Sequence, residues 1–291
     1  MRWTPGGESQ NIEDERGSSG GGGMIGGRGL GLGGFLILLV LSLVFRQDFF
    51  SLLGGGGGGA PVGDPGTGAP TVPVKSTPEE DREVQFVSFV LDDAQHAWSQ
   101  ILPQDGTPYR DAKLVLFRGA IQSGCGFAQA AMGPFYCPVD HKVYLDLGFF
   151  QELEQRFGAP GEFAQAYVVT HELGHHVQSL LGTDARVRRL QDSHPEAANE
   201  LSVELELQAD CFAGVWAHST DQRQLLEKGD VESALGAAAA VGDDRIQKAQ
   251  TGGVHPESFT HGTSAQRVAW FRRGFESGRT DACDTFGRAA P

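Results

Sequence analysis

Three residues within the stretch THELGHHVQSL, at positions 170–180, have the types and the spacing of a metal-dependent hydrolytic site. His171 and His175 are four residues apart, so on a helix they face the same way and both imidazoles can reach one tetrahedral ion. Glu172 follows the first histidine and can take the proton of a water that the metal activates. The H-E-x-x-H pattern therefore predicts two metal ligands and a general base within five residues.

A zinc site that catalyses hydrolysis needs a third protein ligand, and the helical stretch 195–219 offers one. Glu206 lies beyond His175 in the chain and can complete the donor set. Asp210, one turn further on, shares the helical face of Glu206 and can accept a hydrogen bond from the outer nitrogen of a ligand histidine. We therefore expect Zn²⁺ to be bound by His171, His175 and Glu206, with Asp210 behind one of the histidines.

Other readings of the histidines stay open at this point. Two histidines and a glutamate can also recur by chance on a solvated helix face. His176 points about 100° away from His175, so we expect a packing or surface histidine there. His261 precedes a helix that Thr263 or Ser264 can cap; as a catalytic residue it would stabilise the oxyanion of a tetrahedral intermediate, and otherwise local hydrogen bonds hold it.

The elements that must position these residues are mostly helical, with a small sheet before the HExxH helix. Thr77 starts a capping box with Pro at the first helical position, and Gly182 stands where a helix would end. Residues 135–138 and 142–147 have the pattern of a hairpin. The expected fold class is α+β. The predicted elements are helices over 77–101, 161–181 and 195–219 and strands over 113–118, 135–138 and 142–147.

The N-terminal quarter of the chain differs in composition from the rest. Much of it is Gly- and Pro-rich, as in GGGGGGAPVGDPGTGAPTVP at 54–73, and buries too little apolar surface to fold. The uncharged residues between Arg28 and Arg46 would span about 25 Å as a helix, close to a membrane's thickness. A cleaved signal peptide is the alternative. The predicted organisation is a disordered segment over 1–28, a transmembrane signal anchor over 29–46, a Gly/Pro-rich linker over 47–76 and one folded domain over 77–291.

Charge restricts what the protein binds and how it is oriented. A net charge of −14 argues against a nucleic-acid surface, because neutralising phosphates requires clustered Lys and Arg. Arg2, Arg16 and Arg28 precede the apolar stretch and fewer basic residues follow it, which predicts an N-terminus in the cytoplasm. The folded domain is then expected on the extracytoplasmic side of the cytoplasmic membrane, anchored by one helix.

Four cysteines, an even number without C-x-x-C spacing, suit two disulfide bonds in an oxidising compartment. Of the three possible pairings we favour Cys125 with Cys137, around the predicted hairpin, and Cys211 with Cys283, which ties the ligand helix to the C-terminal tail. Four buried thiols in a reducing compartment are the alternative. No cysteine has the spacing expected of a metal ligand here.

Several motifs together resemble a known family, the bacterial membrane-anchored predicted neutral zinc metallopeptidases. HExxH followed by ExxAD is also similar to the gluzincin arrangement of membrane endopeptidases related to the CAAX prenyl protease and the heat-shock protease. The opening 17 residues look like the family's N-terminus, so the resemblance covers nearly the whole chain. The motifs that carry it are HELGHH at 171–176, ELQADCFAG at 206–214, GPFYCPVDHKVYLD at 133–146 and FTHGTSAQR at 259–267.

The resemblance implies a zincin-like metallopeptidase domain. It assigns His171, His175 and Glu206 as zinc ligands, Glu172 as the general base and Asp210 as the acid behind the ligands. The segment around His261 resembles the Thr-His-Pro segment of the related endopeptidases, with Gly in place of Pro.

The function expected from these observations is that of a zinc-dependent endopeptidase at the cell envelope, acting on a peptide or protein substrate. One alternative is a non-catalytic envelope scaffold that zinc stabilises. A closed site with four protein ligands would favour this alternative. The other alternative is a zinc amide hydrolase with a non-protein envelope substrate.

Overall fold

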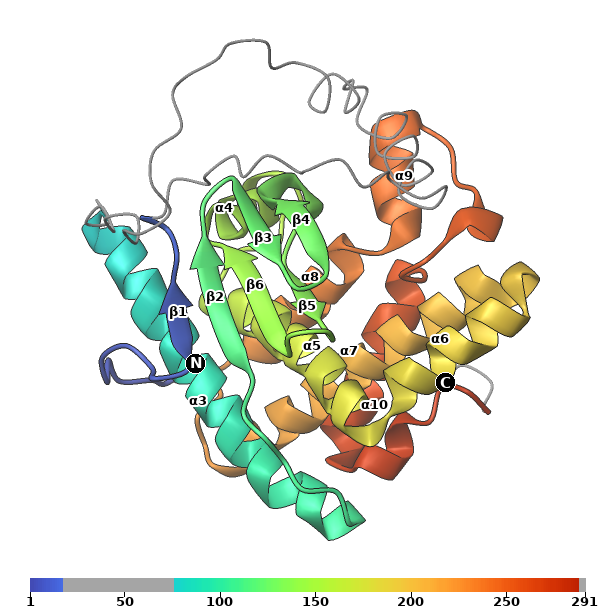
Figure 1. Ribbon diagram of the computed structural model, residues 1–291. Helices are drawn as coiled ribbons and strands as arrows, with labels where there is room; N and C mark the ends of the chain where they lie inside the picture. Colours follow the sequence, from blue (N-terminus) through green and yellow to red (C-terminus); the bar gives the residue numbers. More distant parts are fainter. Residues whose placement is uncertain (18–75, 288–291) are drawn as a thin grey trace, which may run out of the picture. The chain divides into compact units, whose positions relative to one another are not determined.

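A mixed sheet, with helices packed on one of its faces, forms the framework of residues 1–17 and 76–287, the part of the chain that the computed structural model describes (Figure 1). The strands are β1 (Ile12–Asp14), β2 (Lys113–Phe117), β3 (Ala120–Ser123), β4 (Gly126–Gln129), β5 (Phe135–Cys137) and β6 (Lys142–Asp146). The sheet has the order β1-β2-β6-β5, with β1, β2 and β6 parallel and β5 antiparallel to β6. Strands β3 and β4 form a separate hairpin. The predicted strand over 113–118 and the predicted hairpin before the HExxH helix are confirmed.

The helices follow the capping signals of the sequence closely. They are α3 (Pro78–Ile101), α4 (Gly148–Gln155), α5 (Glu162–Leu181), α6 (Thr183–Ser193), α7 (Ala198–Gln222), α8 (Asp230–Ala240), α9 (Asp243–Thr251) and α10 (Ser264–Ser277). Thr77 closes its capping box, and Gly182 ends α5 at a φ of 72°. Helix α7 begins three residues later than predicted, because Pro195–Ala197 form a 3₁₀ turn first.

The two faces of the sheet bury different partners, as the period-2 alternation of a strand requires. Leu114 and Leu116 of β2 belong to the main core, which includes the apolar faces of α3 and α5. Val115 and Phe117 point to the other face and belong to a smaller cluster, against which Ile121 of the β3–β4 hairpin packs. The sheet therefore lies between the helices and the hairpin, and it is not open to solvent on either side of β2.

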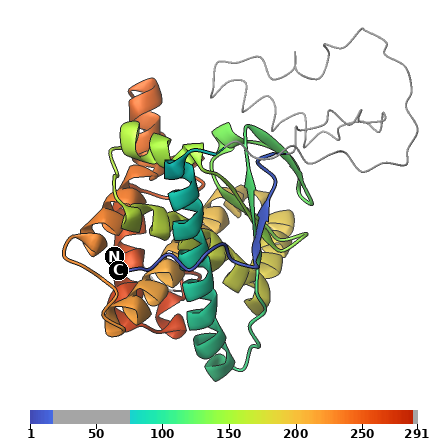
Figure 2. The same ribbon diagram turned by 90° about the vertical axis from the view of Figure 1, so that its left-hand side faces the viewer.

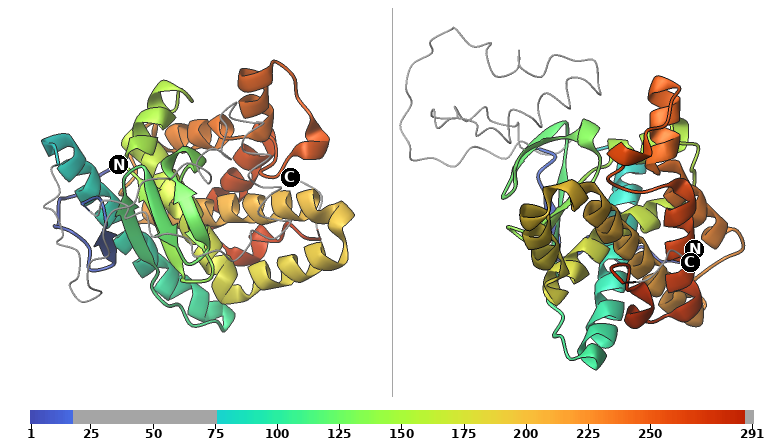
Figure 3. Two further views of the ribbon diagram at one scale, coloured as in Figure 1. Left: turned by 45° about the horizontal axis from the view of Figure 1, so that its top comes forward. Right: turned by 90° about the vertical axis from the view of Figure 1, so that its right-hand side faces the viewer.

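Close helix contacts bring the HExxH helix to the helix of Glu206. A Cβ atom on Gly174 of α5 would lie 2.9 Å from the carbonyl oxygen of Ala209 in α7. On the opposite side of α7, a Cβ on Gly274 of α10 would overlap the carbonyl of Cys211. Glycine at these two positions lets the backbones of α5, α7 and α10 approach closely. Helix α7 therefore packs against both α5 and α10 (Figure 3).

The first 17 residues are part of this fold, so the prediction of a disordered segment over 1–28 is wrong for them. Strand β1 pairs with β2 at the edge of the sheet, and Figure 2 shows it running beside α3. Trp3 packs its ring 5.2 Å from that of Phe86, and its Nε1 donates to Glu162 at 3.0 Å. The folded domain therefore includes residues outside the predicted range 77–291. Strand β1 has only three residues, which is too short to show the alternation of apolar and polar residues by which a strand is recognised in a sequence.

This packing conflicts with one part of the predicted orientation, the placement of the N-terminus on the opposite side of the membrane from the folded domain. A single membrane crossing between residues 17 and 76 would put β1 and β2 on opposite sides of the bilayer, where they could not pair. The predicted anchor over 29–46 and the linker up to residue 75 lie outside the described residues. Among the helices that the structure describes, none is both long and apolar enough to cross a membrane.

Candidate metal centre

Three predicted ligands meet at the contact between α5 and α7. Nε2 of His171 lies 3.2 Å from one carboxylate oxygen of Glu206, and Nε2 of His175 lies 3.3 Å from the other. The two imidazole rings face each other nearly at right angles, with centroids 4.9 Å apart. One donor atom from each of the three residues lies within 4.8 Å of the others. Among the described residues, this is the group of His, Cys, Asp and Glu side chains arranged to hold a metal ion.

The donor set and its spacing fit zinc. Tetrahedral Zn²⁺ at about 2.1 Å from its nitrogen and oxygen ligands requires those atoms to be about 3.4 Å apart. The two distances between the histidines and Glu206 are close to this value. Two neutral imidazoles and one carboxylate are also the ligand types of known catalytic zinc sites.

A charged network stands behind His171. Its Nδ1 lies 2.9 Å from Oδ1 of Asp210, which turns Nε2 towards Glu206. Asp210 is fully buried and also accepts hydrogen bonds from the hydroxyl of Tyr167, at 2.5 Å, and from Nε of Arg267, at 2.8 Å. Arg267 is itself almost wholly buried. The carboxylate at position 210 therefore has the partners that its burial demands.

A neutral network stands behind His175. Its Nδ1 lies 2.8 Å from Oε1 of Gln178, one turn later on α5. Nε2 of Gln178 donates to the carbonyl of Leu205, at 2.6 Å, and to Oε1 of Gln208, at 3.2 Å. Gln208 donates in turn to the carbonyl of Cys283 at 2.9 Å. Each ligand histidine thus has a partner that fixes its ring orientation, but the two partners differ in charge.

The charges of the cluster shift its pKa values in opposite directions. Burial lowers the pKa of His171, but the charge and hydrogen bond of Asp210 outweigh this and raise it to about 10. Burial raises the pKa of Glu206, yet the neighbouring charge of His175 and its hydrogen bonds with both histidines bring it well below its usual range. In the metal-free protein these shifts favour the protonated form of His171 and the ionised form of Glu206, and a bound cation would take the place of that proton beside the carboxylate.

The other two predicted catalytic residues lie beside the cluster. Glu172 is largely buried on α5, three residues before His175 on the same helix. His261 lies in the loop before α10, with half of its side chain exposed. Its Nδ1 lies 3.2 Å from Oδ1 of Asp243, and the charge of Glu206 contributes to raising its pKa. His261 does not belong to the three-residue cluster, but the next residue of its loop, Gly262, lies against Val203 and Leu207 of α7.

His176 is a packing residue rather than a ligand. It is buried, and its Nε2 lies 2.7 Å from the carbonyl oxygen of Arg110, to which it donates. Its Nδ1 lies 3.0 Å from the hydroxyl of Tyr136 on β5, and that hydroxyl also contacts Nδ1 of His141 at 2.9 Å. These contacts attach the edge strand β5 to the HExxH helix.

Both disulfide bonds of the favoured pairing are present. Cys125 is bonded to Cys137, which ties the turn of the β3–β4 hairpin to β5. Cys211, directly after Asp210, is bonded to Cys283. The second bond fixes the segment whose carbonyl accepts the hydrogen bond from Gln208.

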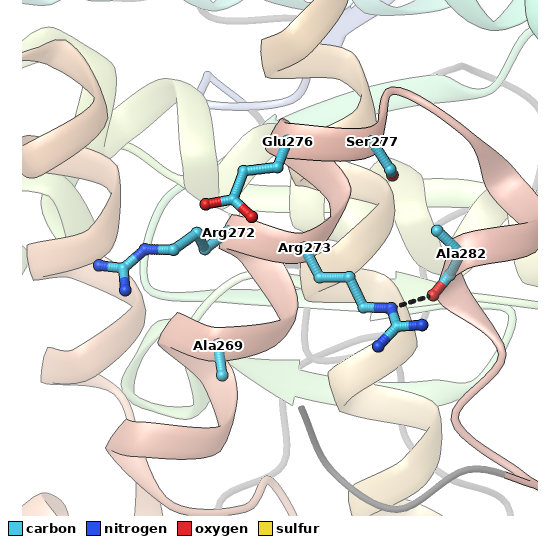
Figure 4. Close-up of a pocket in the computed structure, with 6 residues that line it drawn as sticks. All are labelled: Ala269, Arg272, Arg273, Glu276, Ser277 and Ala282. Atoms are coloured by element: carbon cyan, nitrogen blue, oxygen red, sulfur yellow. Dashed lines mark hydrogen bonds between the residues drawn. The ribbon is translucent and has the colours of Figure 1, made fainter.

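The surface recess drawn in Figure 4 lies apart from the metal centre. It has a volume of about 590 Å³ and is bounded by α10 and the turn that follows it. Nε of Arg273 donates to the carbonyl of Ala282 at 2.6 Å across this recess. None of its lining residues belongs to the metal cluster. They are Ala269, Arg272, Arg273, Glu276, Ser277 and Ala282.

The sequence did not predict three contacts around the site: Gln178 with His175, Asp243 with His261, and Arg267 with Asp210. Gln178 lies on the HExxH helix three residues after His175, so its helical position could have suggested a contact with that histidine. Asp243 and Arg267 lie far along the chain from their partners. Neither has a local pattern that predicts the contact.

The fold and the site define an α+β protein with a helix-borne His-His-Glu centre of the kind found in zinc hydrolases. The chain belongs to the family described as "Putative neutral zinc metallopeptidase", whose model matches residues 1–286. The match begins at the first residue, which agrees with β1 as part of the domain.

Two bacterial relatives illustrate how far the similarity extends. YpfJ of Escherichia coli K12 is 48% identical over 298 residues, covering 99% of this chain and the whole of YpfJ. Rv2575 of Mycobacterium tuberculosis H37Rv is 47% identical over 203 residues, which is 66% of this chain and 67% of the relative. Neither name states an activity. No solved structure matches the chain.

Proposed function

We propose that this protein is a zinc-dependent endopeptidase of the cell envelope. The observation that carries the proposal is the set of three donor atoms from His171, His175 and Glu206, with Glu172 beside it on the same helix. The family description agrees with this function, and the three-residue donor set leaves a fourth tetrahedral position for water or substrate.

The reaction assigned to this site is hydrolysis of a peptide bond. Zinc held by the three ligands would supply Lewis-acid chemistry, polarising the scissile carbonyl and lowering the pKa of water. Glu172 takes the proton of the attacking water and passes it to the leaving amine. His261 donates from Nε2 to the oxyanion that develops on the carbonyl, because its Nδ1 is engaged by Asp243. Asp210, at Nδ1 of His171, keeps Nε2 of that ring turned towards Glu206, where it would hold the metal.

An extended peptide can reach this site along β5. Within the described sheet β5 is the outermost strand, and it packs against α5. Tyr136 of β5 contacts His176, which directly follows His175 in the chain. The strand therefore runs close to the proposed ligand. A substrate that added to the free edge of β5 would form backbone hydrogen bonds independent of its side chains.

The scaffold alternative is less well supported by the donor set. A purely structural zinc site is closed by four protein ligands. Among the described residues, the cluster has three members, and His261, the fourth candidate from the sequence, is engaged by Asp243 instead. For the non-protein amide alternative, no specific observation in the described residues speaks in its favour.

We place the activity outside the cytoplasm. The two disulfide bonds require an oxidising compartment to form and persist. Because β1 pairs with β2, residues 1–17 must lie on the same side of the membrane as the rest of the domain.

Zinc content and hydrolysis of unfolded casein by the full chain test the proposal. We expect one zinc per chain and cleavage by the parent protein. Glu172→Gln should keep its zinc and lose casein hydrolysis by at least about 100-fold, because the general base is absent while the ligands remain. His171→Ala should lose both zinc and activity.

A matched control is Glu154→Gln, which removes the same charge from an exposed position on α4. It should retain the zinc and the activity of the parent. Full activity of Glu172→Gln would refute the assignment of the base, and a zinc-loaded parent that cuts no casein would favour the scaffold.

A further inference from the structure

A single carboxylate holds the loop that carries His261. Oδ2 of Asp243, the first residue of α9, accepts hydrogen bonds from the backbone N–H groups of Thr260 and His261, each at 2.7 Å, and of Gly262, at 3.1 Å. The backbone N–H of Asp243 donates to the carbonyl oxygen of Gly262 at 2.9 Å. One side chain therefore determines the path of three consecutive residues.

The other oxygen of the same carboxylate contacts the imidazole. Oδ1 of Asp243 lies 3.2 Å from Nδ1 of His261, and Oγ1 of Thr260 lies 3.0 Å from the same nitrogen. The side chain of Asp243 is 12% exposed and that of His261 is 52% exposed, so the carboxylate is the anchored partner. With Nδ1 engaged, Nε2 is the ring nitrogen through which His261 can contact a substrate.

The loop is also seated on the helix turn that carries Glu206. Gly262 has a φ of 86°, and a Cβ atom there would lie 3.1 Å from Val203 and 3.4 Å from Leu207 of α7. These two residues flank Glu206 on the helix. The position of the loop is thereby coupled to the position of the metal ligand.

We propose that Asp243 is a positioning residue for the reaction, which orients the imidazole of His261 towards the carbonyl oxygen of a bound peptide. The inference rests on the proposed function, in which His261 contacts that oxygen. Asp243 itself touches neither the metal ligands nor the substrate in this assignment. Its effect on the reaction passes through His261.

The adjacent Asp244 provides a matched control. Its Oδ1 accepts hydrogen bonds from the backbone N–H of Ser264, at 2.7 Å, and from the hydroxyl of Ser264, at 2.8 Å. It therefore anchors the start of α10 and has no contact with His261. Asp243→Asn and Asp244→Asn remove the same charge from neighbouring positions, and each weakens hydrogen bonds to the loop region.

Kinetics of the zinc-loaded full chain on fluorescently labelled casein test the proposal. Asp243→Asn should lower kcat by about 10- to 100-fold with little change in KM or zinc content, because misaligned groups lose mainly transition-state stabilisation. Asp244→Asn should stay within about twofold of the parent. The double variant Asp243→Asn/His261→Gln should be no slower than His261→Gln, since both changes remove one interaction. Equal losses in the two Asn variants, or additive losses in the double variant, would overturn the proposal.

A second measurement does not depend on activity. The imidazole NMR signal of His261 should titrate at lower pH in Asp243→Asn than in the parent, and at the parent's pH in Asp244→Asn. An unchanged titration in Asp243→Asn would refute the contact itself. A parent that cuts no casein would instead refute the proposed function, so the two failures can be told apart.

Discussion

The two sides of the candidate metal centre orient their histidines by different physical means. Behind His171 lies a buried ion pair, in which Asp210 and Arg267 are both almost completely removed from water. Behind His175 lies the neutral amide of Gln178, whose further contacts are also uncharged. Both arrangements present Nε2 to Glu206, at 3.2 and 3.3 Å. Orienting a ligand histidine therefore does not require a charge.

The two sides should differ in how much stability the protein loses when one partner is removed. A buried ion pair is strongly destabilising when one partner is removed, because the other charge stays uncompensated. A neutral hydrogen bond contributes only about 1 kcal/mol net. The Asp210 side should therefore couple metal binding to the stability of the fold, whereas the Gln178 side should affect mainly the affinity for the metal.

The largest effect is expected for Asp210→Ala. It leaves the buried guanidinium of Arg267 without its carboxylate and should lower the free energy of unfolding by about 3–5 kcal/mol. It should also weaken zinc binding by about 10- to 100-fold, because Nδ1 of His171 loses its partner. Urea unfolding and zinc titration measure the two effects. A loss of zinc affinity with unchanged stability would remove the distinction between the two sides.

The second-largest expected effect is a loss of stability of the metal-free protein as the pH rises. The pKa of His171 is raised to about 10 from the ordinary value of 6.5, chiefly by Asp210 against the effect of burial. Its stabilising contribution is thus fully present below pH 6.5 and is lost as the pH rises through about 10. Thermal unfolding of the chelator-treated protein should show Tm falling across this range. Zinc-loaded protein should not show the fall, because the metal replaces the proton.

Gln178→Leu should have the smallest effect. The substitution removes the partner of Nδ1 of His175 and keeps a side chain of similar volume, so stability should change by about 1 kcal/mol. Zinc affinity should fall by about tenfold. Zinc competition with a coloured chelator measures the change. A loss of stability as large as that of Asp210→Ala would show that the neutral side is equally structural.

The local geometry of the ligand helices could be predicted because it depends on residues close together in the chain. The spacing of His171 and His175 places them on one helical face whatever surrounds them. The capping box at Thr77 and the glycine at position 182 mark helix ends for the same reason. Glu206 and Asp210, four residues apart, share a face of α7 by the same geometry.

The contacts between distant segments could not be predicted in this way. Arg267 meets Asp210 across 57 residues of chain, and β1 meets β2 across about 100. Nothing in the three residues of β1 distinguishes them from a polar linker, because parallel pairing is decided by the partner strand. Counting basic residues takes no account of that pairing either, so the predicted N-terminus on the opposite side of the membrane from the domain conflicts with it.

The sequence by itself determined the types and the helical spacing of the candidate ligands and of Glu172, because a helix converts spacing into direction without reference to the rest of the fold. Only the tertiary structure decided that α5 and α7 approach closely at Gly174, and that Asp243 reaches the loop of His261. Those contacts depend on how whole helices pack, which is an outcome of the summed burial of many side chains and not of any local pattern.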